Sequence, residues 1–180
     1  MVFYTQQVNT PGGTMLVAVD EDGAVVQLVL PNGFEYWATQ VTRHHYTIIE
    51  DASHCANVVK QLEEYFQRKR TVFDLPLKPQ GTPFQQSVWS TLCSIPYGAT
   101  ITYKELAERI GRPAAIRAVG RANATNPIPI IVPCHRVIGT DGSLTGFGGG
   151  LALKEFLLTL EGVNLKAFSK DGDSQQLRLF

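Results

Sequence analysis

The sequence predicts an α+β protein: an N-terminal domain with a small β-sheet and a helix, followed by a mainly helical C-terminal domain with a helix-turn-helix and an active-site cysteine. Three observations predict this class. The first 50 residues are rich in strand formers, and apolar residues at helical spacing dominate after residue 83. Between them, Leu75–Pro83 is rich in Pro and Gly and lacks periodicity. We therefore expect two domains, 1–80 and 81–180, and the chain is long enough for a core.

The first part of the chain is expected to form a hairpin, a further strand and a helix. Met15–Asp20 and Ala24–Leu30 are β-rich runs on either side of a turn that contains Gly23. A further short strand is expected near Tyr46–Ile49. Apolar residues at four-residue spacing then predict a helix over Ala52–Lys69; they are Val58, Leu62 and Phe66.

The second part of the chain contains four expected helices. One begins at Pro83 and carries an apolar stripe, and the next begins at a Thr102–Glu105 capping box and ends at Gly111. Ala114–Ala122 follows after a tight turn, which predicts a helix-turn-helix. Its small residues would let it approach nucleic acid closely, although they would equally permit tight helix packing. Leu151–Leu160 is the last expected helix, with Leu153, Phe156, Leu157 and Leu160 facing inward.

The zero net charge hides an asymmetry along the chain. Lys and Arg total 16 and Asp and Glu total 16, but residues 81–180 carry 10 basic and 7 acidic side chains. Residues 109–136 hold five arginines and no acid, which suits phosphate binding, although a solvated face is the alternative. The arginines, which we expect around the surface that meets a duplex, are Arg109, Arg112, Arg117, Arg121 and Arg136.

The three cysteines are an odd number without C-x-x-C spacing, so a disulfide framework is not expected. Cys134 follows a run with prolines at 127, 129 and 133, which hold its backbone entry extended. His135 and Arg136 could favour its thiolate, the reactive form of a thiol. A buried structural thiol is the alternative, which the rigid entry and adjacent histidine make less favoured. Cys93 is expected in the core.

Two features near the C-terminal helix are candidate site elements. Glu161 lies in its last turn, where a carboxylate opposes the helix dipole. It is either an ordinary exposed residue or the partner that orients a histidine. Residues 146–150 form a glycine-rich loop that lacks the phosphate-loop pattern, so its backbone N–H groups could meet a substrate or it could be only a turn.

These residues together resemble the O6-alkylguanine-DNA alkyltransferases, also called methylated-DNA–protein-cysteine methyltransferases. The central motif is Pro133-Cys134-His135-Arg136-Val137, preceded by Asn126-Pro127 and followed by the glycine-rich loop and Glu161-Gly162. Gly81-Thr82-Pro83-Phe84-Gln85, Ile95-Pro96-Tyr97-Gly98 and Arg117-Ala118-Val119-Gly120 also match. The resemblance is strong from about residue 81 to 163 and loose before that.

The resemblance implies a ribonuclease-H-like N-terminal domain and a suicide enzyme of DNA repair that works without cofactor or metal. It implies direct, irreversible and stoichiometric transfer of the alkyl group from O6-alkylguanine to Cys134. The thiolate would form through a relay by way of water to His135 and then Glu161, and Asn126 would brace the active-site turn. O4-alkylthymine is left open as a second substrate.

The resemblance also implies how double-stranded DNA is bound. The helix-turn-helix would enter the minor groove, Arg117 would replace the flipped nucleotide, and Tyr103 would help rotate the base out. The backbone at Cys134 and Val137 would accept from the guanine amino group, and the Gly148 N–H would face the alkylated oxygen. The remaining expected binding residues are Ala118, Gly120, Arg121 and Phe147.

The chain departs from the family pattern at several positions. Phe147 stands where many members have Tyr, and Gly148 where many have a larger residue, which leaves the alkyl-size preference open. His44, His45, His54 and Cys55 do not match the zinc pattern of some members, so no metal is expected. A monomer without a membrane segment is expected, in the cytoplasm or, for a eukaryote, the nucleus. The tail 166–180 is polar with an apolar end.

Two other functions fit part of the pattern. A non-catalytic lesion-binding or regulatory protein could use the same helix-turn-helix, but alkyltransferase-like proteins of that kind lack the cysteine that is present here. A cysteine hydrolase could use Cys134, His135 and Glu161, but the arginine-rich helix with a small-residue face would have no purpose in it.

Overall fold

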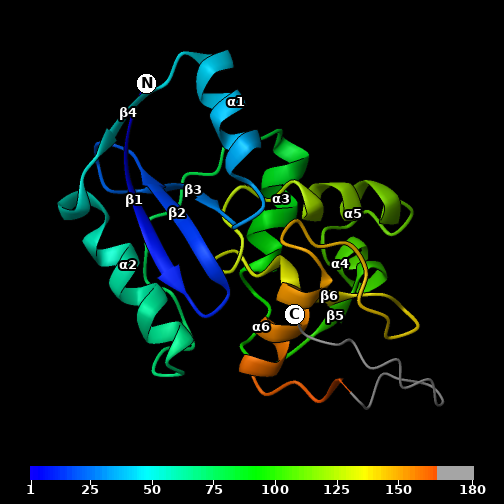
Figure 1. Ribbon diagram of the computed structural model, residues 1–180. Coiled ribbons are helices and arrows are strands. Elements are labelled where there is room, and N and C mark those ends of the chain that lie inside the picture. The colour runs from blue at the N-terminus through cyan, green and yellow to red at the C-terminus, as the bar shows by residue number, and fades with distance from the viewer. Residues whose placement is uncertain (166–180) are drawn as a thin grey trace.

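The N-terminal part of the molecule is a four-stranded mixed sheet (Figure 1). The computed structural model describes residues 1–165, and the polar tail that begins at Lys166 lies outside the described residues. The strand order is β3-β2-β1-β4. β1 pairs antiparallel with β2 and parallel with β4, and β2 pairs antiparallel with β3. The strands are β1 (Val2–Thr10), β2 (Gly13–Val19), β3 (Val25–Val29) and β4 (Thr47–Glu50).

The predicted hairpin is confirmed and its turn is closed by one side chain. Asp20 Oδ1 accepts hydrogen bonds from the backbone N–H groups of Asp22 at 3.1 Å and Ala24 at 3.0 Å. Gly23 adopts φ 77°, a left-handed conformation that glycine enters at little cost. The strand expected near Tyr46–Ile49 is also present, as β4.

Helices cover the sheet on both faces, which explains why β2 and β3 are apolar at consecutive positions. α2 (Ala52–Phe66) packs on β1 and β2, where Val58 joins the main core. On the opposite face, Phe3 contacts Trp37 of α1 (Phe34–His44), with ring centroids 6.3 Å apart. The two helices therefore lie on opposite faces of the sheet, whose edge strand β4 is exposed.

One sequence expectation about this part was wrong. The first 50 residues were expected to contain only strands, but α1 is a helix without a buried residue. Phe34, Trp37 and Val41 share one helical face, so the helical spacing is present in the sequence, but the aromatic residues of this run also favour strands. The long first strand β1 lies in the part expected to form strands, although its bounds were not predicted.

The C-terminal part consists of helices around a short parallel pair of strands. Both α3 and α4 begin at capping boxes, in which Thr82 and Thr102 each accept from a backbone N–H three residues later. α4 and α5 pack together as the predicted helix-turn-helix. The elements are α3 (Pro83–Leu92), β5 (Ile101–Thr102), α4 (Tyr103–Arg109), α5 (Ile116–Ala124), the 3₁₀ turn η1 (Cys134–Arg136), β6 (Val137–Ile138) and α6 (Leu151–Leu160).

Two further details differ from the expectation for this part. The second helix of the helix-turn-helix begins at Ile116 rather than near Pro113, because residues 112–115 form a turn closed by Ala115 N–H and the Arg112 carbonyl at 2.8 Å. Cys93 is exposed at the end of α3 rather than packed in the core. Cys93 is the C-cap residue of α3, so its side chain lies outside the apolar stripe of the helix.

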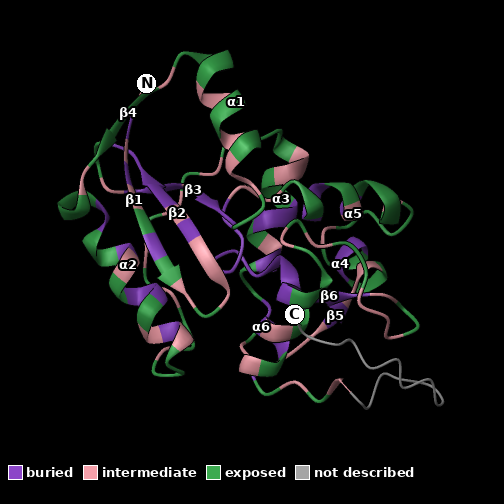
Figure 2. Cartoon of the chain, in the orientation of Figure 1, coloured by how far each residue is buried: buried purple, intermediate pink, exposed green. Residues whose placement is uncertain are grey.

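One buried cluster connects the two parts of the chain (Figure 2). It contains Met15 and Val58 from the sheet and α2 together with Val88 and Leu157 from the helices. The backbone N–H of Leu28 in β3 also donates to the Pro127 carbonyl at 2.9 Å. The sheet therefore supports the segment that leads to Cys134.

Candidate active site

Cys134 lies at the end of a buried apolar segment, on the first residue of η1. Ile128, Ile130 and Val132 are fully buried and anchor that segment, and the thiol residue itself is 4% exposed. Asn126 bridges the segment, because its side-chain Nδ2 donates to the Val132 carbonyl at 2.8 Å and its Oδ1 accepts from Ile128 N–H at 3.0 Å. The position of the sulfur is thus fixed by the backbone before it.

The Cys134 thiol opens onto a groove of about 680 Å³. Phe147 and Gly148 line the groove beside the thiol, and residues of α1 form its far wall. A Cβ added at Gly148 would have no heavy atom closer than 3.9 Å, so the groove has room at this position. A Cβ at Gly149 would lie 2.7 Å from Leu153, which explains a glycine there.

The thiol is protonated in the resting site. Burial raises the pKa of Cys134 to about 11, although the Asn126 side chain and the positive charge of Lys154 act in the opposite direction. A nucleophilic thiolate therefore needs a base nearby.

His135 and Glu161 form a buried pair next to this thiol. His135 Nε2 lies 2.8 Å from Glu161 Oε1, and both side chains are fully shielded from solvent. Burial lowers the pKa of His135, while the hydrogen bond to Glu161 raises it, and the net direction is down. An ionised carboxylate only accepts, so Nε2 carries the hydrogen and Nδ1 keeps its lone pair. Within the described residues, Nδ1 has no hydrogen-bond partner.

Glu161 is held as a carboxylate by several donors. Burial alone would raise its pKa, but hydrogen bonds from His135 and Arg136 lower it to about 2. Arg136 donates through Nε to Oε2 and through Nη2 to Oε1, both at 2.9 Å, and Gly98 N–H adds a bond to Oε2 at 3.0 Å. These contacts stabilise the charge at the end of α6 despite the unfavourable helix dipole.

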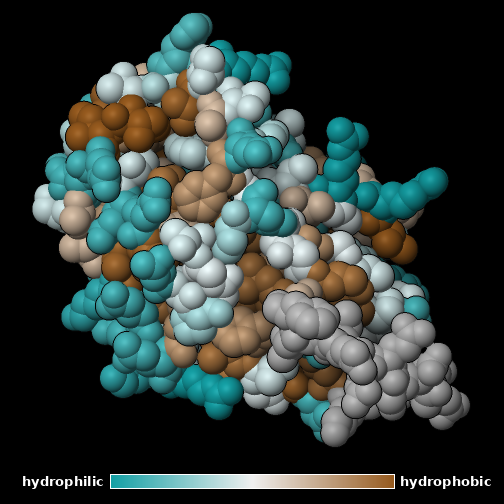
Figure 3. All heavy atoms as spheres, in the orientation of Figure 1, coloured by the Kyte–Doolittle hydropathy of each residue, from teal (hydrophilic) through white to brown (hydrophobic). Residues whose placement is uncertain are grey.

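Arg136 does not lie on the surface expected to meet a duplex, which corrects the expectation for the five arginines. It is 6% exposed and paired with Glu161, because a buried carboxylate needs a cation beside it. The other four, Arg109, Arg112, Arg117 and Arg121, are exposed. Figure 3 shows hydrophilic side chains projecting from the surface over α5.

The expected binding residues lie on the helix-turn-helix and around the groove. Arg117, Ala118 and Arg121 are exposed on α5, and a Cβ at Gly120 would lie 3.8 Å from the ring of Tyr103. The hydroxyl of Tyr103 donates to the Thr145 carbonyl at 3.1 Å and so connects α4 to the glycine-rich loop.

Val137 is fully buried in β6, directly after the Cys134–Arg136 turn. Phe147 and Gly148 line the groove together with Cys134, whereas Arg117, Ala118 and Arg121 lie on the exposed side of α5.

Three polar residues of this region were missed by sequence reasoning. Lys154 is fully buried, and its ammonium donates to the carbonyls of Val137 at 2.6 Å and Thr145 at 2.8 Å. Asn123 donates to the Cys134 carbonyl at 3.3 Å. Tyr65 of α2 donates to Glu161 at 2.7 Å. Lys154 shares a helical face with the buried Leu157 and Leu158, a spacing that would have singled it out.

Among the residues that the structure describes, no three His, Cys, Asp or Glu side chains come together as a possible metal site. His54 instead stacks on Tyr4, with centroids 3.8 Å apart, and bonds Asp51. Within 1–165, no helix is long and apolar enough to cross a membrane.

The fold and the site together define a class of protein: a nucleic-acid-binding protein whose helix-turn-helix lies beside a buried cysteine, histidine and glutamate. A family model described as the 6-O-methylguanine DNA methyltransferase DNA-binding domain matches residues 83–163.

Relatives extend this similarity over most of the chain. A methylated-DNA–protein-cysteine methyltransferase of Methanosarcina acetivorans is 56% identical over 154 residues, which is 86% of this chain and 95% of that one. A constitutive one of Bacillus subtilis is 42% identical over 92% of this chain and 99% of its own. The crystal structure of Mycobacterium tuberculosis OGT in complex with DNA has a TM-score of 0.77 at 42% identity, over 88% of this chain and 92% of that chain. The chain belongs to the methylated-DNA–protein-cysteine methyltransferase family.

Proposed function

We propose that this chain repairs DNA by transferring an alkyl group from the O6 atom of guanine directly and irreversibly to Cys134. The observation that carries the proposal is the buried thiol beside the His135–Glu161 pair, at the foot of a helix-turn-helix. Family membership supports the same reaction, and the M. tuberculosis OGT structure contains DNA. The enzyme is consumed, because a thioether has no leaving group that water readily displaces.

The transfer step is a displacement at the alkyl carbon. The Cys134 sulfur forms a bond to that carbon while the carbon–O6 bond breaks, and the bonding pair stays on guanine. The thiol loses its proton on the way to the transition state, and guanine takes up one proton as it leaves. The products are S-alkylcysteine and unmodified guanine.

His135 is the base that this step requires. With a thiol pKa of about 11, only about one molecule in ten thousand is thiolate at pH 7. Nδ1 of neutral His135 can take the proton by way of a water molecule, and Glu161 then stabilises the imidazolium through Nε2. Asn126 braces the turn that presents the sulfur.

The helix-turn-helix presents the lesion to this site from the minor groove. The small residues Ala118 and Gly120 let α5 approach the duplex, and Arg121 binds phosphate. Arg117 occupies the space of the flipped nucleotide, and Tyr103 helps to rotate the base out. Flipping is required because the alkylated oxygen is out of reach of a buried thiol while the base is stacked.

The flipped guanine is recognised by backbone groups around the thiol. The acceptors for its amino group are the carbonyls of Cys134 and Val137, each of which has a second lone pair beside the one that accepts from Asn123 or Lys154. The Gly148 N–H faces O6, and Phe147 lines the pocket. The partner is thus double-stranded DNA that contains O6-alkylguanine. The protein works as a monomer in the cytoplasm. Its two domains, 1–80 and 81–180, pack against each other through the shared buried cluster.

The decisive test is incubation with duplex DNA containing O6-methylguanine, followed by peptide mass spectrometry. We expect one methyl group on the Cys134 peptide and none elsewhere. Cys134→Ala should abolish transfer while still binding lesion DNA, because the binding surface is unchanged. Cys93→Ala, which removes an exposed thiol outside the groove, is the matched control and should transfer normally. An unmodified Cys134 peptide, or methyl on another residue, would overturn the proposal.

A further inference from the structure

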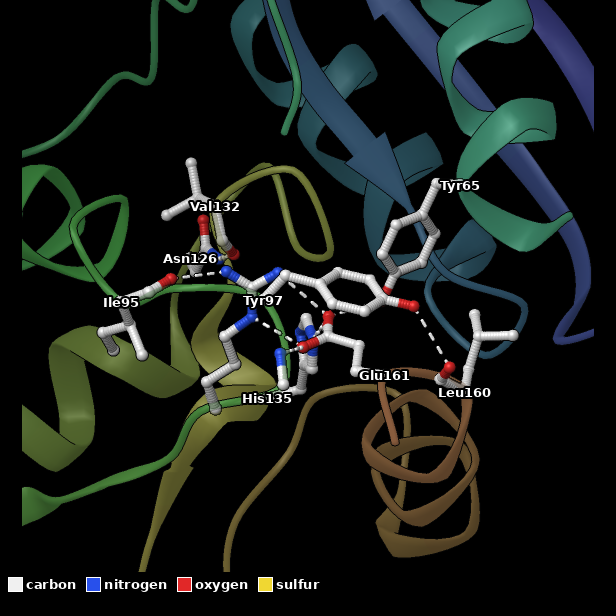
Figure 4. Close-up of polar contacts among 10 residues, drawn as sticks. Tyr65, Ile95, Tyr97, Asn126, Val132, His135, Leu160 and Glu161 are labelled. Carbon is white, nitrogen blue, oxygen red and sulfur yellow. Dashed lines mark hydrogen bonds and ion pairs between the residues drawn. The ribbon is translucent and has the colours of Figure 1, made fainter. Parts of the chain in front are cut away.

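A tyrosine from the N-terminal part of the chain reaches the His135–Glu161 pair. Tyr65 lies near the end of α2, is fully buried, and donates its hydroxyl proton to Glu161 Oε1 at 2.7 Å (Figure 4). The rings of Phe66, Phe73 and Tyr97 surround it, with centroid distances of 5.4, 5.4 and 6.1 Å. This packing fixes the direction of the hydroxyl, so the contact belongs to the folded architecture of α2.

The hydroxyl acts on the same oxygen that holds His135. Glu161 Oε1 accepts from Tyr65, from His135 at 2.8 Å and from Arg136 Nη2 at 2.9 Å, whereas Oε2 accepts from Arg136 Nε and Gly98 N–H. Each carboxylate oxygen offers about two lone-pair sites, so the three donors on Oε1 compete for its negative charge. A stronger bond from one donor therefore weakens the bonds of the other two.

Tyr65 remains a donor at every pH at which the protein works. Burial, followed by the adjacent Glu161 charge, raises the pKa of its hydroxyl far above the ordinary value. It draws charge from Oε1 without adding a positive charge. Glu161 is consequently less able to stabilise a proton on His135 than it would be without this bond.

We propose that Tyr65 is a positioning residue for alkyl transfer: through its hydrogen bond to Glu161 Oε1 it fixes the carboxylate and limits how strongly that carboxylate holds a proton on His135. This rests on the proposed function of Cys134 and His135. It gives α2, in the N-terminal part of the chain, a role in the chemistry through Glu161.

The ionisable groups that face the pair come from four segments. They are Tyr65 on α2, Tyr97 in the segment after α3, Cys134 and Arg136 on η1, and Lys154 on α6, in addition to His135 and Glu161 themselves. Arg136 and Lys154 oppose protonation of His135, and Glu161 favours it. Removing the Tyr65 hydroxyl changes only the contribution of Glu161 to the pKa of His135, so the expected direction of that pKa change is upward.

The test is Tyr65→Phe, which keeps the packed ring and removes the donor. His135 should become more basic, because Oε1 then interacts more strongly with it. The acid limb of the single-turnover rate against pH should therefore move up by about one pH unit. On that limb the transfer rate of Tyr65→Phe should be about tenfold lower than that of the wild-type protein at the same pH. Histidine ¹⁵N resonances should report the same upward shift for His135 without any DNA.

Tyr97→Phe is the matched control. It also removes a tyrosine hydroxyl at this interface, but that hydroxyl donates to the Leu160 carbonyl at 3.1 Å and not to Glu161 (Figure 4). Its pH midpoint should equal that of the unchanged protein. Thermal denaturation separates stability from chemistry, because a purely structural role would lower the melting temperature and leave the midpoint where it was.

The outcomes separate the two proposals. If the unchanged protein methylates Cys134 and Tyr65→Phe keeps both the rate midpoint and the His135 resonance, the role of Tyr65 is refuted and the proposed function stands. If the unchanged protein does not methylate Cys134, the proposed function fails, and the His135 titration alone decides whether Tyr65 tunes the pair. A Tyr65→Phe protein that does not fold would also refute the positioning role, since the hydroxyl would then be a requirement of the fold.

Discussion

Lys154 is a charged side chain that the fold buries completely beside a thiol. Its ammonium donates hydrogen bonds to two backbone carbonyls, and Nζ lies 6.0 Å from the ring centroid of Tyr103. Burial lowers its pKa to about 8, while Cys134 acts to raise it. A buried cation next to Cys134 favours the thiolate over the thiol by direct attraction. At the residue scale, the site thus combines His135, a base for the thiol proton, with Lys154, a cation that stabilises the thiolate.

We expect Lys154→Met to slow alkyl transfer about tenfold, because loss of the positive charge raises the pKa of Cys134 by about one unit. The change keeps the volume of the side chain, so DNA binding should persist. The single-turnover transfer rate and the pH dependence of thiol alkylation by iodoacetamide measure the effect. Lys60→Met, at an exposed position of α2, serves as the control. Equal rates in the two variants would contradict the role of the charge.

At the scale of the element, α5 combines two exposed arginines, Arg117 and Arg121, with a face of small residues. Gly120 lies against the Tyr103 ring, so α5 and the first residue of α4 present one surface. The capping box at Thr102 fixes where α4 begins and therefore where Tyr103 points. Arg117 and Tyr103 consequently have a fixed relation to each other, which is what a concerted flipping step requires.

If Arg117 fills the space of a flipped nucleotide, as proposed, Arg117→Ala should slow transfer from duplex DNA about tenfold. Transfer from the free base O6-benzylguanine should be unaffected, since that substrate needs no flipping. Comparing the two rates is the measurement. Arg121→Ala serves as the control. It should weaken DNA binding, but a saturating protein concentration should restore its transfer rate on duplex DNA. An Arg117→Ala rate on duplex equal to that of the unchanged protein would remove the flipping role.

At the scale of the whole molecule, the zero net charge is a sum of two opposite parts. Residues 1–80 carry 6 basic and 9 acidic side chains, and four exposed arginines gather on the helix-turn-helix. DNA attraction depends on local charge, because other charges farther away than the screening length contribute little. The balance therefore allows a DNA-binding face on a neutral molecule.

Duplex affinity should fall with salt in proportion to the phosphates that these arginines contact. We expect Arg112→Ala to reduce the slope of log K against log salt by about 0.9. Arg43→Ala, at the end of α1, should leave the slope unchanged. Fluorescence anisotropy over a salt series measures both. A slope that changes with Arg43 and not with Arg112 would place the DNA on another face.

The sequence by itself determined the fold class, the capping boxes, the helix-turn-helix and the motif around Cys134. These depend on residues close together in the chain, such as Thr102 with Glu105, so they can be read locally. It did not reveal α1, because the aromatic residues of that run also favour strands and conceal the helical spacing.

The resemblance already implied the His135–Glu161 pair, but only the tertiary structure revealed the other polar groups buried with it. Arg136 pairs with Glu161 and is not exposed to DNA, and Lys154 is buried with its ammonium on the Val137 carbonyl. Tyr65, from the N-terminal part of the chain, donates to Glu161. Burial of a charge depends on every element packed around it, and the partners here lie far apart in sequence. A hydrogen bond between such residues exists only after the core has closed, and no local pattern in the sequence encodes it.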